Sequence, residues 1–351
     1  MQAQSCELAA PVRAGTAPTM LIGNGGHEHV GAHLLHAAEE LRLPVSFVNI
    51  SDAYTGSAIH RKVNWWVRGH RPARLREFSE KVLEQCRSEQ AGAVLTTGLA
   101  PLDASILQRL GGERITRINF LTDDPWNPAH RALWFMKALP FYDFVFTPRR
   151  ANIEDLRGLG CRIVQYLPFG YSSQVHFPEA AGAGLSSDVL FAGGADPDRV
   201  PWISALLQQG ISVGLYGGYW DRYSETREHA RGNADPPTLR RAAAAAKVAL
   251  CLVRRANRDG HAMRTFEIPA MKACMIVEKT QDHLELFGPE GNAVLYFDSI
   301  PEMVEKVRWL LQRPEERQSL AENAYRLVVK GGHTYRHRLQ TMLAQASGAE
   351  Q

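Results

Sequence analysis

The residues best suited to chemistry lie in the segment RRANRDGHAMRTFE, which spans residues 254–267. Four arginines and a histidine precede a predicted helix start at Thr265: Arg254, Arg255, Arg258, His261 and Arg264. Free backbone N–H groups and the dipole at a helix N-terminus already favour negative charge, so cations there suit a diphosphate. Glu267, in the first helical turn, offers a carboxylate to a ribose diol. A solvated basic loop beside a glutamate-capped helix is an equal alternative.

A second candidate is the glycine-rich stretch GNGGHEHVGAHLLH, residues 23–36. It does not fit a dinucleotide fingerprint, because Gly23, Gly25 and Gly26 are followed by bulky residues and lack the G-x-G-x-x-G spacing. We therefore predict that His27 lies in a loop at the end of the first strand and faces a ligand-binding cleft. Gly25 and Gly26 then let the substrate approach.

The same stretch could instead bind a metal ion. His29 and His33 are four residues apart and His36 is three further on, an acceptable spacing for two ligands on a helix. Neither an H-E-x-x-H motif nor a cysteine cluster accompanies them, so we predict no metal and expect His33 and His36 to be partly exposed helix residues.

A third candidate is NFLTDDPWNP, in which a strand ends in two carboxylates. Asp123 is a candidate for a general base, and Asp124 and Trp126 are candidates for acceptor binding, since a flat aromatic face suits a sugar. The alternative is an Asx-type cap ahead of the next helix. The D-D pair differs from the D-x-D motif of metal-dependent transferases, which agrees with a metal-free reaction.

Short apolar runs that alternate with segments of helical periodicity are typical of βαβ units. In the first half the predicted strands are 20–23, 45–50, 93–97, 115–121, 144–147 and 162–166, with helices at 30–41 and 73–86 among them. In the second half they are DVLFAGG, SVGLYGG, VALCLV, CMIV and AVLYF, with helices at 197–208, 237–246 and 265–272. Three helices end the chain, at 301–312, 314–330 and 335–345. The predicted fold is α/β, with two Rossmann-like domains whose strand ends face a common cleft, where ligands bind in such sheets.

The segment YLPFGYSSQVHFPEAAGAG interrupts this rhythm with prolines and glycines, as a linker would. We predict a disordered leader at 1–18, an N-terminal Rossmann-like domain at 19–170 and a linker at 171–186. A second Rossmann-like domain would follow at 187–332. Residues 333–351 would form a C-terminal helix and tail, which can return to the N-terminal domain.

The composition limits the classes of function. The chain has 351 residues, 45% of them hydrophobic and 22% charged, as in globular proteins, and we identify no transmembrane run or signal peptide. A net charge of +3 is too small to imply nucleic-acid binding. The five cysteines are scattered without C-x-x-C spacing, which argues against disulfides and a zinc site and predicts a cytoplasmic protein.

Residues 187–340 resemble the CgeB-like glycosyltransferases, a branch of the group-1 enzymes with the GT-B fold. The similarity rests on DVLFAGG, YGGYW, VALCLVR, RTFE, LYFDS and HTYRHR, and the linker LPFGYSSQVHFP is similar to the family's interdomain passage. The first half matches only in general layout. The resemblance implies two Rossmann-like domains, a nucleotide-sugar donor held mainly by the second, an acceptor held by the first and no obligatory metal or other cofactor.

By this resemblance Glu267 corresponds to the family's ribose-binding glutamate. Asp259 stands where group-1 enzymes place the first acid of E-x7-E, and its shorter side chain leaves its role open. Arg199 stands where the family has a cation for the diphosphate, and Lys272 replaces a usual glycine. The predicted donor-binding residues are Arg199, Tyr216, Gly217, Arg254, Asp259, His261, Arg264, Thr265 and Glu267.

These features predict a metal-independent, hexosyltransferase-like enzyme that moves a sugar from a nucleoside-diphosphate sugar to a hydroxyl of a glycan, a protein or a small molecule. If the reaction inverts the anomeric centre, His27 or Asp123 is the base. If it retains the configuration, no protein base is needed. The alternatives are a sugar-nucleotide epimerase of the same fold and a non-catalytic nucleotide-sugar-binding module. An NAD-dependent oxidoreductase would need the dinucleotide fingerprint that the first loop lacks.

Overall fold

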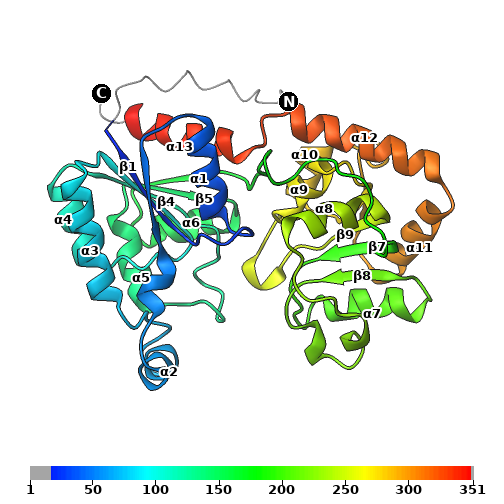
Figure 1. The fold of residues 1–351 in the computed structure, drawn as a ribbon, viewed down its shortest axis with the longest axis horizontal. Coiled ribbons are helices and arrows are strands. Elements are labelled where there is room, and N and C mark those ends of the chain that lie inside the picture. Colours follow the sequence, from blue (N-terminus) through cyan, green and yellow to red (C-terminus); the bar gives the residue numbers. More distant parts are fainter. Residues whose placement is uncertain (1–16, 349–351) are drawn as a thin grey trace. The chain divides into compact units, whose positions relative to one another are not determined.

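The computed structural model describes residues 17–348, so the leader predicted at 1–18 falls, up to residue 16, outside the described residues. Two compact units share the chain (Figure 1). The first unit contains the chain up to Pro168 together with residues 256–258 and the segment from Tyr335 onward. The second unit contains Phe169–Arg255 and Asp259–Thr334.

The first unit is built on a parallel sheet of six strands in the order β2-β1-β3-β4-β5-β6. The strands are β1 (Thr19–Gly23), β2 (Val45–Asn49), β3 (Ala93–Thr97), β4 (Thr116–Phe120), β5 (Phe144–Thr147) and β6 (Ile163–Tyr166). The helices are α1 (Val30–Glu40), α2 (Ala58–Trp66), α3 (Leu75–Ser88), α4 (Ala104–Gly112), α5 (Leu133–Ala138), α6 (Ala151–Gly158) and α13 (Tyr335–Gly348). Helices on both faces bury the sheet, which explains why β3 and β5 read as continuous apolar runs.

The second unit has a parallel sheet of five strands in the order β11-β10-β9-β7-β8. The strands are β7 (Ser187–Ala192), β8 (Val213–Tyr216), β9 (Ala246–Cys251), β10 (Met275–Glu278) and β11 (Leu295–Phe297). The helices are α7 (Val200–Gln208), α8 (Pro236–Ala245), α9 (Arg264–Ala270), α10 (Gln281–Phe287), α11 (Ile300–Leu311) and α12 (Pro314–Lys330). The two parallel sheets confirm the predicted fold class. Every predicted strand is present, and its ends agree with the structure to within two residues.

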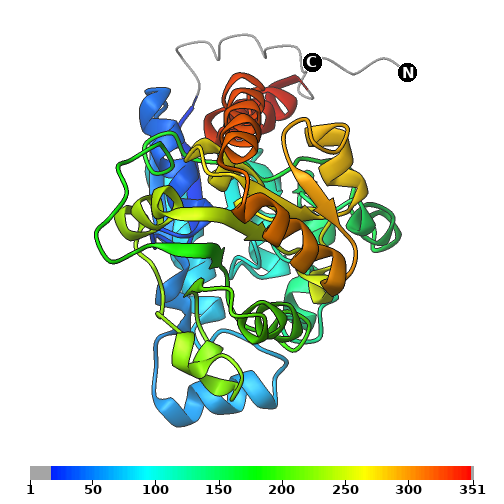
Figure 2. The ribbon, with the colours of Figure 1, turned by 90° about the vertical axis from the view of Figure 1, so that its right-hand side faces the viewer.

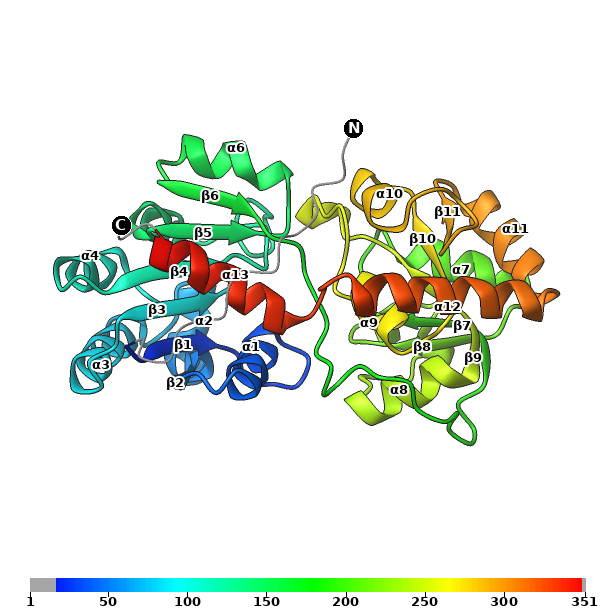
Figure 3. The same cartoon turned by 90° about the horizontal axis from the view of Figure 1, so that it is seen from above.

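The last helix, α13, packs on α1 of the first unit (Figure 3). His33 on α1 stacks on the ring of Tyr335, with centroids 5.1 Å apart and planes 15° from parallel. His33 is therefore only 1% exposed, and the expectation that it is a partly exposed helix residue was wrong. The four-residue spacing of the histidines gave no sign of this burial, because the covering helix lies three hundred residues further along the chain.

Among residues 17–348, no helix combines the length and the apolar composition that crossing a bilayer requires. Cys86, Cys161, Cys251 and Cys274 are buried free thiols. Lys272 adopts a φ of +60°, the left-handed conformation for which glycine is preferred, and its ammonium lies 2.6 Å from a carboxylate oxygen of Glu322.

The turn from β1 to α1 depends on two glycines that approach each other. A Cβ on Gly31 would lie 3.0 Å from the Cα of Gly23 and 2.8 Å from the carbonyl oxygen of Asn24. A Cβ on Gly23 would in turn lie 2.7 Å from the hydroxyl of Thr97. Because backbone atoms cannot move away as a flexible side chain can, this crossing of strand and helix requires glycine at both positions.

We expect Gly31→Ala to lower the free energy of unfolding by about 1–3 kcal/mol, the usual cost of overpacking. Gly112→Ala is the matched control, since a Cβ at that helical position meets nothing within 4 Å and alanine favours helix. Chemical denaturation of both variants checks this. Equal stability of Gly31→Ala and the parent chain would show that the close approach is not required.

Candidate functional site

Three guanidinium groups gather around the loop that follows β7 in the second unit. Arg199, at the start of α7, donates from Nη1 to the carbonyl oxygen of Gly194 at 3.1 Å. Arg264, at the start of α9, donates from Nε to the carbonyl oxygen of Ala192, also at 3.1 Å. The Nη2 of Arg254 lies 3.7 Å from where a Cβ of Gly194 would stand. The carboxyl end of a parallel strand, where open α/β sheets bind ligands, thus carries a concentrated positive charge.

Carboxylates lie beside the arginines of this cluster, and Glu267 pairs with Arg264. The carboxylate of Asp196 lies 3.7 Å from the Nε of Arg199 and 3.6 Å from that of Arg254, beyond hydrogen-bonding distance in both cases. Burial and the neighbouring charge of Arg254 lower the pKa of Arg199. The two guanidinium groups repel each other, and the carboxylate of Asp196, within ion-pair distance of both, offsets part of that repulsion.

The neighbouring strand end, at β8, fixes the shape of this loop. Gly217 has a φ of +129°, and a Cβ there would lie 2.1 Å from the carbonyl oxygen of Gly193. The indole N–H of Trp220 donates to that same oxygen at 2.8 Å. Tyr216 is buried, and its hydroxyl accepts from Arg231 at 3.3 Å. Glycine is required at 217, because a side chain there would collide with the backbone of the loop after β7.

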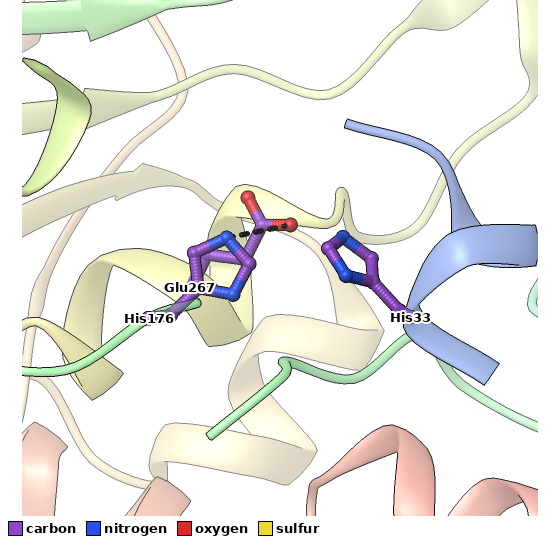
Figure 4. Close-up of side chains that lie close together, drawn as sticks. All are labelled: His33, His176 and Glu267. Atoms are coloured by element: carbon purple, nitrogen blue, oxygen red, sulfur yellow. Dashed lines mark ion pairs between the residues drawn. The ribbon is translucent and has the colours of Figure 1, made fainter. Parts of the chain in front are cut away.

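Glu267 lies on α9, beside the cluster, and is 1% exposed. One carboxylate oxygen pairs with Arg264 of the preceding turn, and the other lies 3.6 Å from Nε2 of His176. Figure 4 shows the imidazole of His176 facing the carboxylate of Glu267. The close-up also draws His33, which belongs to α1 of the first unit. Arg264, one turn earlier on the same helix, and His176, far away in the sequence, therefore position this glutamate.

The protonation of His176 follows from its contacts. The backbone N–H of Ser172 donates to Nδ1 at 3.2 Å, so the neutral ring carries its proton on Nε2, which faces Glu267. Burial lowers the pKa of His176, although the carboxylate of Glu267 opposes this shift. The ring is therefore neutral near pH 7 and offers Glu267 a donor without adding a charge.

Two further residues predicted to bind the donor are engaged within the protein. His261 is buried, with Nδ1 2.8 Å from Asp282, while Nε2 accepts from the backbone N–H of Phe169 at 3.1 Å. The hydroxyl of Thr265 lies 2.9 Å from Nε2 of His283, whose pKa is lowered to about 4, chiefly by burial. Both residues hold the start of α9 in place, and their predicted contact with the donor stays a prediction.

The basic loop 254–264 divides its charges between different partners. Arg255 pairs with Glu278 at 2.9 Å, with its side chain 55% exposed. Arg258 has a φ of +52° and groups with the first unit, where it contacts Asp124 and Asp155. Asp259 donates its backbone N–H to the carbonyl oxygen of Arg254 at 3.3 Å. Of the loop's arginines, only Arg254 and Arg264 reach the cluster after β7.

In the first unit, the strand-end loop after β1 is open to solvent. Gly25, Gly26 and His27 are all exposed, and the N–H of Gly26 donates to Oδ1 of Asn24 at 2.9 Å. A hollow beside this loop is lined by side chains and backbone of α1, α3, β2 and the turn after it, including Gly25, His27, His36, Phe47, Asn49, Asp52, Lys81 and Gln85. His27 is thus placed where a bound molecule can reach it.

The two carboxylates after β4 have different surroundings. Asp124 is 1% exposed and accepts from Arg258 at 2.6 Å and 3.0 Å, from Asn152 at 2.9 Å and from the N–H of Trp126 at 3.0 Å. The last bond is the Asx-type turn considered as the alternative. Burial would raise the pKa of Asp124, but these hydrogen bonds, led by Arg258, hold it below its usual value.

Asp123, by contrast, is half-buried and its Oδ2 lies 3.4 Å from the hydroxyl of Thr122. Burial and the charge of Asp123 raise the pKa of Tyr54 to about 12, so a phenol stands near this carboxylate. Trp126 is half-buried beneath the guanidinium of Arg258, which lies 5.6 Å from the ring centroid. Of the pair, Asp123 is the more exposed carboxylate.

Comparisons with known proteins agree with this arrangement. Residues 199–344 match the family described as Glycosyl transferase-like. The matched segment begins at Arg199 and includes the helix start that carries Arg264 and Glu267, which confirms the predicted resemblance for the C-terminal half. A sequence comparison with curated proteins gives no match.

Solved structures extend the likeness to the whole chain. Sucrose-phosphate synthase from Thermosynechococcus elongatus has a TM-score of 0.67 at 12% identity, over 95% of this chain and 98% of that one. HepE from Anabaena in complex with UDP-glucose has a TM-score of 0.62 at 11% identity, over 94% and 99%. A UDP-forming α,α-trehalose-phosphate synthase from Burkholderia xenovorans has a TM-score of 0.65 at 13% identity, over 96% and 100%. The chain has the GT-B fold of these glycosyltransferases.

Sequence reasoning missed three residues that shape these sites. Asp196, which faces two arginines, follows the strand-end glycines in GGADPDR and could have been noticed there. His176 lies in the linker segment SSQVHFP, where no periodicity points to it. Tyr54 lies far from Asp123 in the sequence, and only the parallel pairing of β1 with its neighbours brings their strand ends together.

The pairing of Asp124 with Arg258 can be tested through stability. We expect Asp124→Asn to lower the free energy of unfolding by about 3 kcal/mol at pH 7, because one partner of a buried pair is removed. This loss lies at the lower end of the usual range because the side chain of Arg258 is 39% exposed and solvent screens its charge. Asp155→Asn, with a side chain 41% exposed, should cost less than about 1 kcal/mol.

The same variant has a predictable pH dependence. A carboxylate with a lowered pKa stabilises the folded state fully above its unfolded pKa of about 3.9 and loses that contribution as the pH falls through its folded pKa. The stability difference between the parent chain and Asp124→Asn should therefore shrink below about pH 4. Urea unfolding at pH 7 and in acid measures it, and a difference that does not change with pH would contradict this assignment.

Proposed function

We propose that the protein transfers a hexose from a nucleoside-diphosphate sugar, preferentially a UDP-sugar, to an acceptor hydroxyl without an obligatory metal ion. The observation that carries this proposal is the cluster of Arg199, Arg254 and Arg264 around the loop after β7. A group of three arginines at the end of a parallel strand fits a ligand with two adjacent phosphates. The printed description of the HepE complex, which contains UDP-glucose, supports the choice of donor.

In this proposal each side chain near the cluster has a role. The guanidinium groups of Arg254 and Arg264 bind the diphosphate, while Arg199 holds the loop by its two bonds to backbone carbonyls. Glu267 accepts hydrogen bonds from the ribose hydroxyls, with His176 and Arg264 fixing its orientation. Tyr216 and Gly217 shape the base side of the site, and Asp259 lies where the donor sugar would reach.

The chemistry follows from where negative charge develops. As the bond between the anomeric carbon and the diphosphate breaks, its electron pair moves onto the diphosphate oxygen. Preorganised cations at that position stabilise the charge, which is commonly the largest catalytic term in such reactions. Because three guanidinium groups supply positive charge there, the reaction does not depend on a divalent ion for neutralisation.

The first unit would supply the acceptor side. His27, exposed beside its hollow, or the half-buried Asp123 acts as general base if the reaction inverts the anomeric centre. Gly25 and Gly26 leave room for the acceptor, and Trp126 offers a ring face. Asp124, whose oxygens are already bonded, acts by holding the loop of Trp126. The four free cysteines fit a reducing compartment, so we propose a cytoplasmic location.

The donor site is tested with a matched pair of adjacent arginines. We expect Arg254→Gln to weaken UDP binding by about 1.5–3 kcal/mol, the worth of a charge-assisted hydrogen bond, and to leave uridine binding unchanged. Arg255→Gln should leave both unchanged, because Arg255 is exposed and pairs with Glu278. Calorimetry with both ligands measures these differences. Equal losses for UDP and uridine would indicate a folding defect instead of a lost phosphate contact.

The acceptor side is tested at His27. If His27 is the general base, His27→Ala should slow transfer by ~10²–10⁴ and leave UDP affinity unchanged. The neighbouring His29→Ala is the control, since His29 is also exposed but caps α1 with its backbone. Turnover of a panel of sugar nucleotides, with and without acceptors and EDTA, gives the rates. Inactivation by EDTA would overturn the metal-free mechanism, and a free altered sugar nucleotide as the product would identify an epimerase.

A further inference from the structure

Helix α2 of the first unit carries an apolar face that is turned to solvent. Ile59, Trp66 and Val67 are 78%, 79% and 77% exposed, and Val63 is 41% exposed. Positions 59, 63, 66 and 67 recur at the helical spacing that places them on one face. Figures 1 and 2 show α2 at the lower end of the first unit, away from its strands. Among the described residues no other large apolar side chains are as exposed as the first three.

The opposite side of α2 attaches the helix to its unit. Asn64 is 2% exposed, its Oδ1 accepts from Arg68 at 3.3 Å and its carbonyl oxygen accepts from the N–H of Arg71, also at 3.3 Å. The segment that follows is fixed by Trp134, whose indole N–H donates to the carbonyl oxygen of His70 at 3.3 Å. These bonds fix the turn that follows α2 and join it to Trp134 of α5.

The segment around α2 is strongly basic. Residues 53–76 contain no Asp or Glu, and their Lys and Arg residues are Arg61, Lys62, Arg68, Arg71, Arg74 and Arg76. Lys62, Arg68 and Arg71 are exposed. Aliphatic side chains and tryptophan on one face of a helix, flanked by Lys and Arg, are the composition of helices that lie in the interface of a bilayer.

We propose that α2 docks the protein on the surface of an anionic lipid bilayer. Ile59, Val63, Trp66 and Val67 enter the boundary between headgroups and acyl chains, and the surrounding cations contact lipid phosphates. Charge complementarity selects this occupant, because a neutral apolar partner would leave the cations without anions. With nine residues, α2 is too short to cross the bilayer and lies along it. The inference is independent of the proposed transfer reaction.

Co-sedimentation of the full chain with vesicles tests the proposal. Vesicles of phosphatidylglycerol should retain the protein, and vesicles of phosphatidylcholine should not. Binding should weaken as salt is raised, because the electrostatic part is screened. Equal binding to both lipids, or no binding to phosphatidylglycerol at low salt, would overturn the proposal.

Matched variants locate the contact. Trp66→Ser should reduce partitioning onto phosphatidylglycerol by at least ~10-fold, whereas Trp309→Ser, on α11 of the second unit, should not change it. Lys62→Gln should reduce it ~5-fold, and Lys330→Gln, an exposed lysine on α12, should not.

Thermal melting accompanies each variant, and the lysine pair decides the question if Trp66→Ser fails to fold. A parent chain that forms dimers in light scattering, dissociated by Trp66→Ser, would identify α2 as a self-association surface and refute the bilayer. The proposal also fails if all four variants bind vesicles as the parent chain does.

Discussion

The hydrogen bonds of one buried cation, Arg199, fix the loop after β7 in the second unit. Arg199 and Arg254 are held close together at the end of β7, and backbone carbonyls of Gly194 and Leu252, more than carboxylates, accept the hydrogen bonds of Arg199. These carbonyls accept from Nη1 and Nη2 of Arg199, whereas its Nε has no hydrogen-bond partner among the described residues. Carbonyl dipoles do not cancel the charge, so the cluster can still attract an anion. The backbone of this loop is fixed by the close approach of Gly217 and by the indole of Trp220. The short helix α9 carries the third arginine, Arg264. A bound diphosphate would add negative charge beside these arginines and so lower their electrostatic energy.

The fold was readable from the sequence for a simple physical reason. Strands of parallel sheets are buried on both faces, so they appear as apolar runs between glycines, and every predicted strand was found. The helix start at Thr265 was also predicted well, because basic loop and apolar helix differ sharply in composition. Short or strongly polar helices such as α4, α6 and α10 gave weaker patterns and were not specified. Helix α2 escaped notice because its apolar residues do not face a core, which is what periodicity is normally taken to report.

The candidate site was harder to predict than the fold, since contacts between distant segments decide which polar residues are available. Asp123 and Asp124 are adjacent and chemically identical, yet Arg258 occupies the second and leaves the first. The arginines of the loop 254–264 look alike in sequence, and only the structure separates Arg254 from Arg255 and Arg258. Likewise His33 is sealed by Tyr335, a contact that no local pattern announces.

The path of the chain between the two units has a consequence for how the protein is made. The first unit contains residues up to Pro168 but is completed by residues 256–258 and by α13, which follows the second unit along the chain. During synthesis the surface of α1 around His33 stays uncovered until the second unit and then α13 have been made. Contacts of such large sequence separation carry a high loop-closure entropy and form slowly. The N-terminal half should therefore be the part of the nascent chain that most needs a chaperone. Removing the chain from Tyr335 onward should destabilise the first unit more than the second, although the second unit directly precedes the cut.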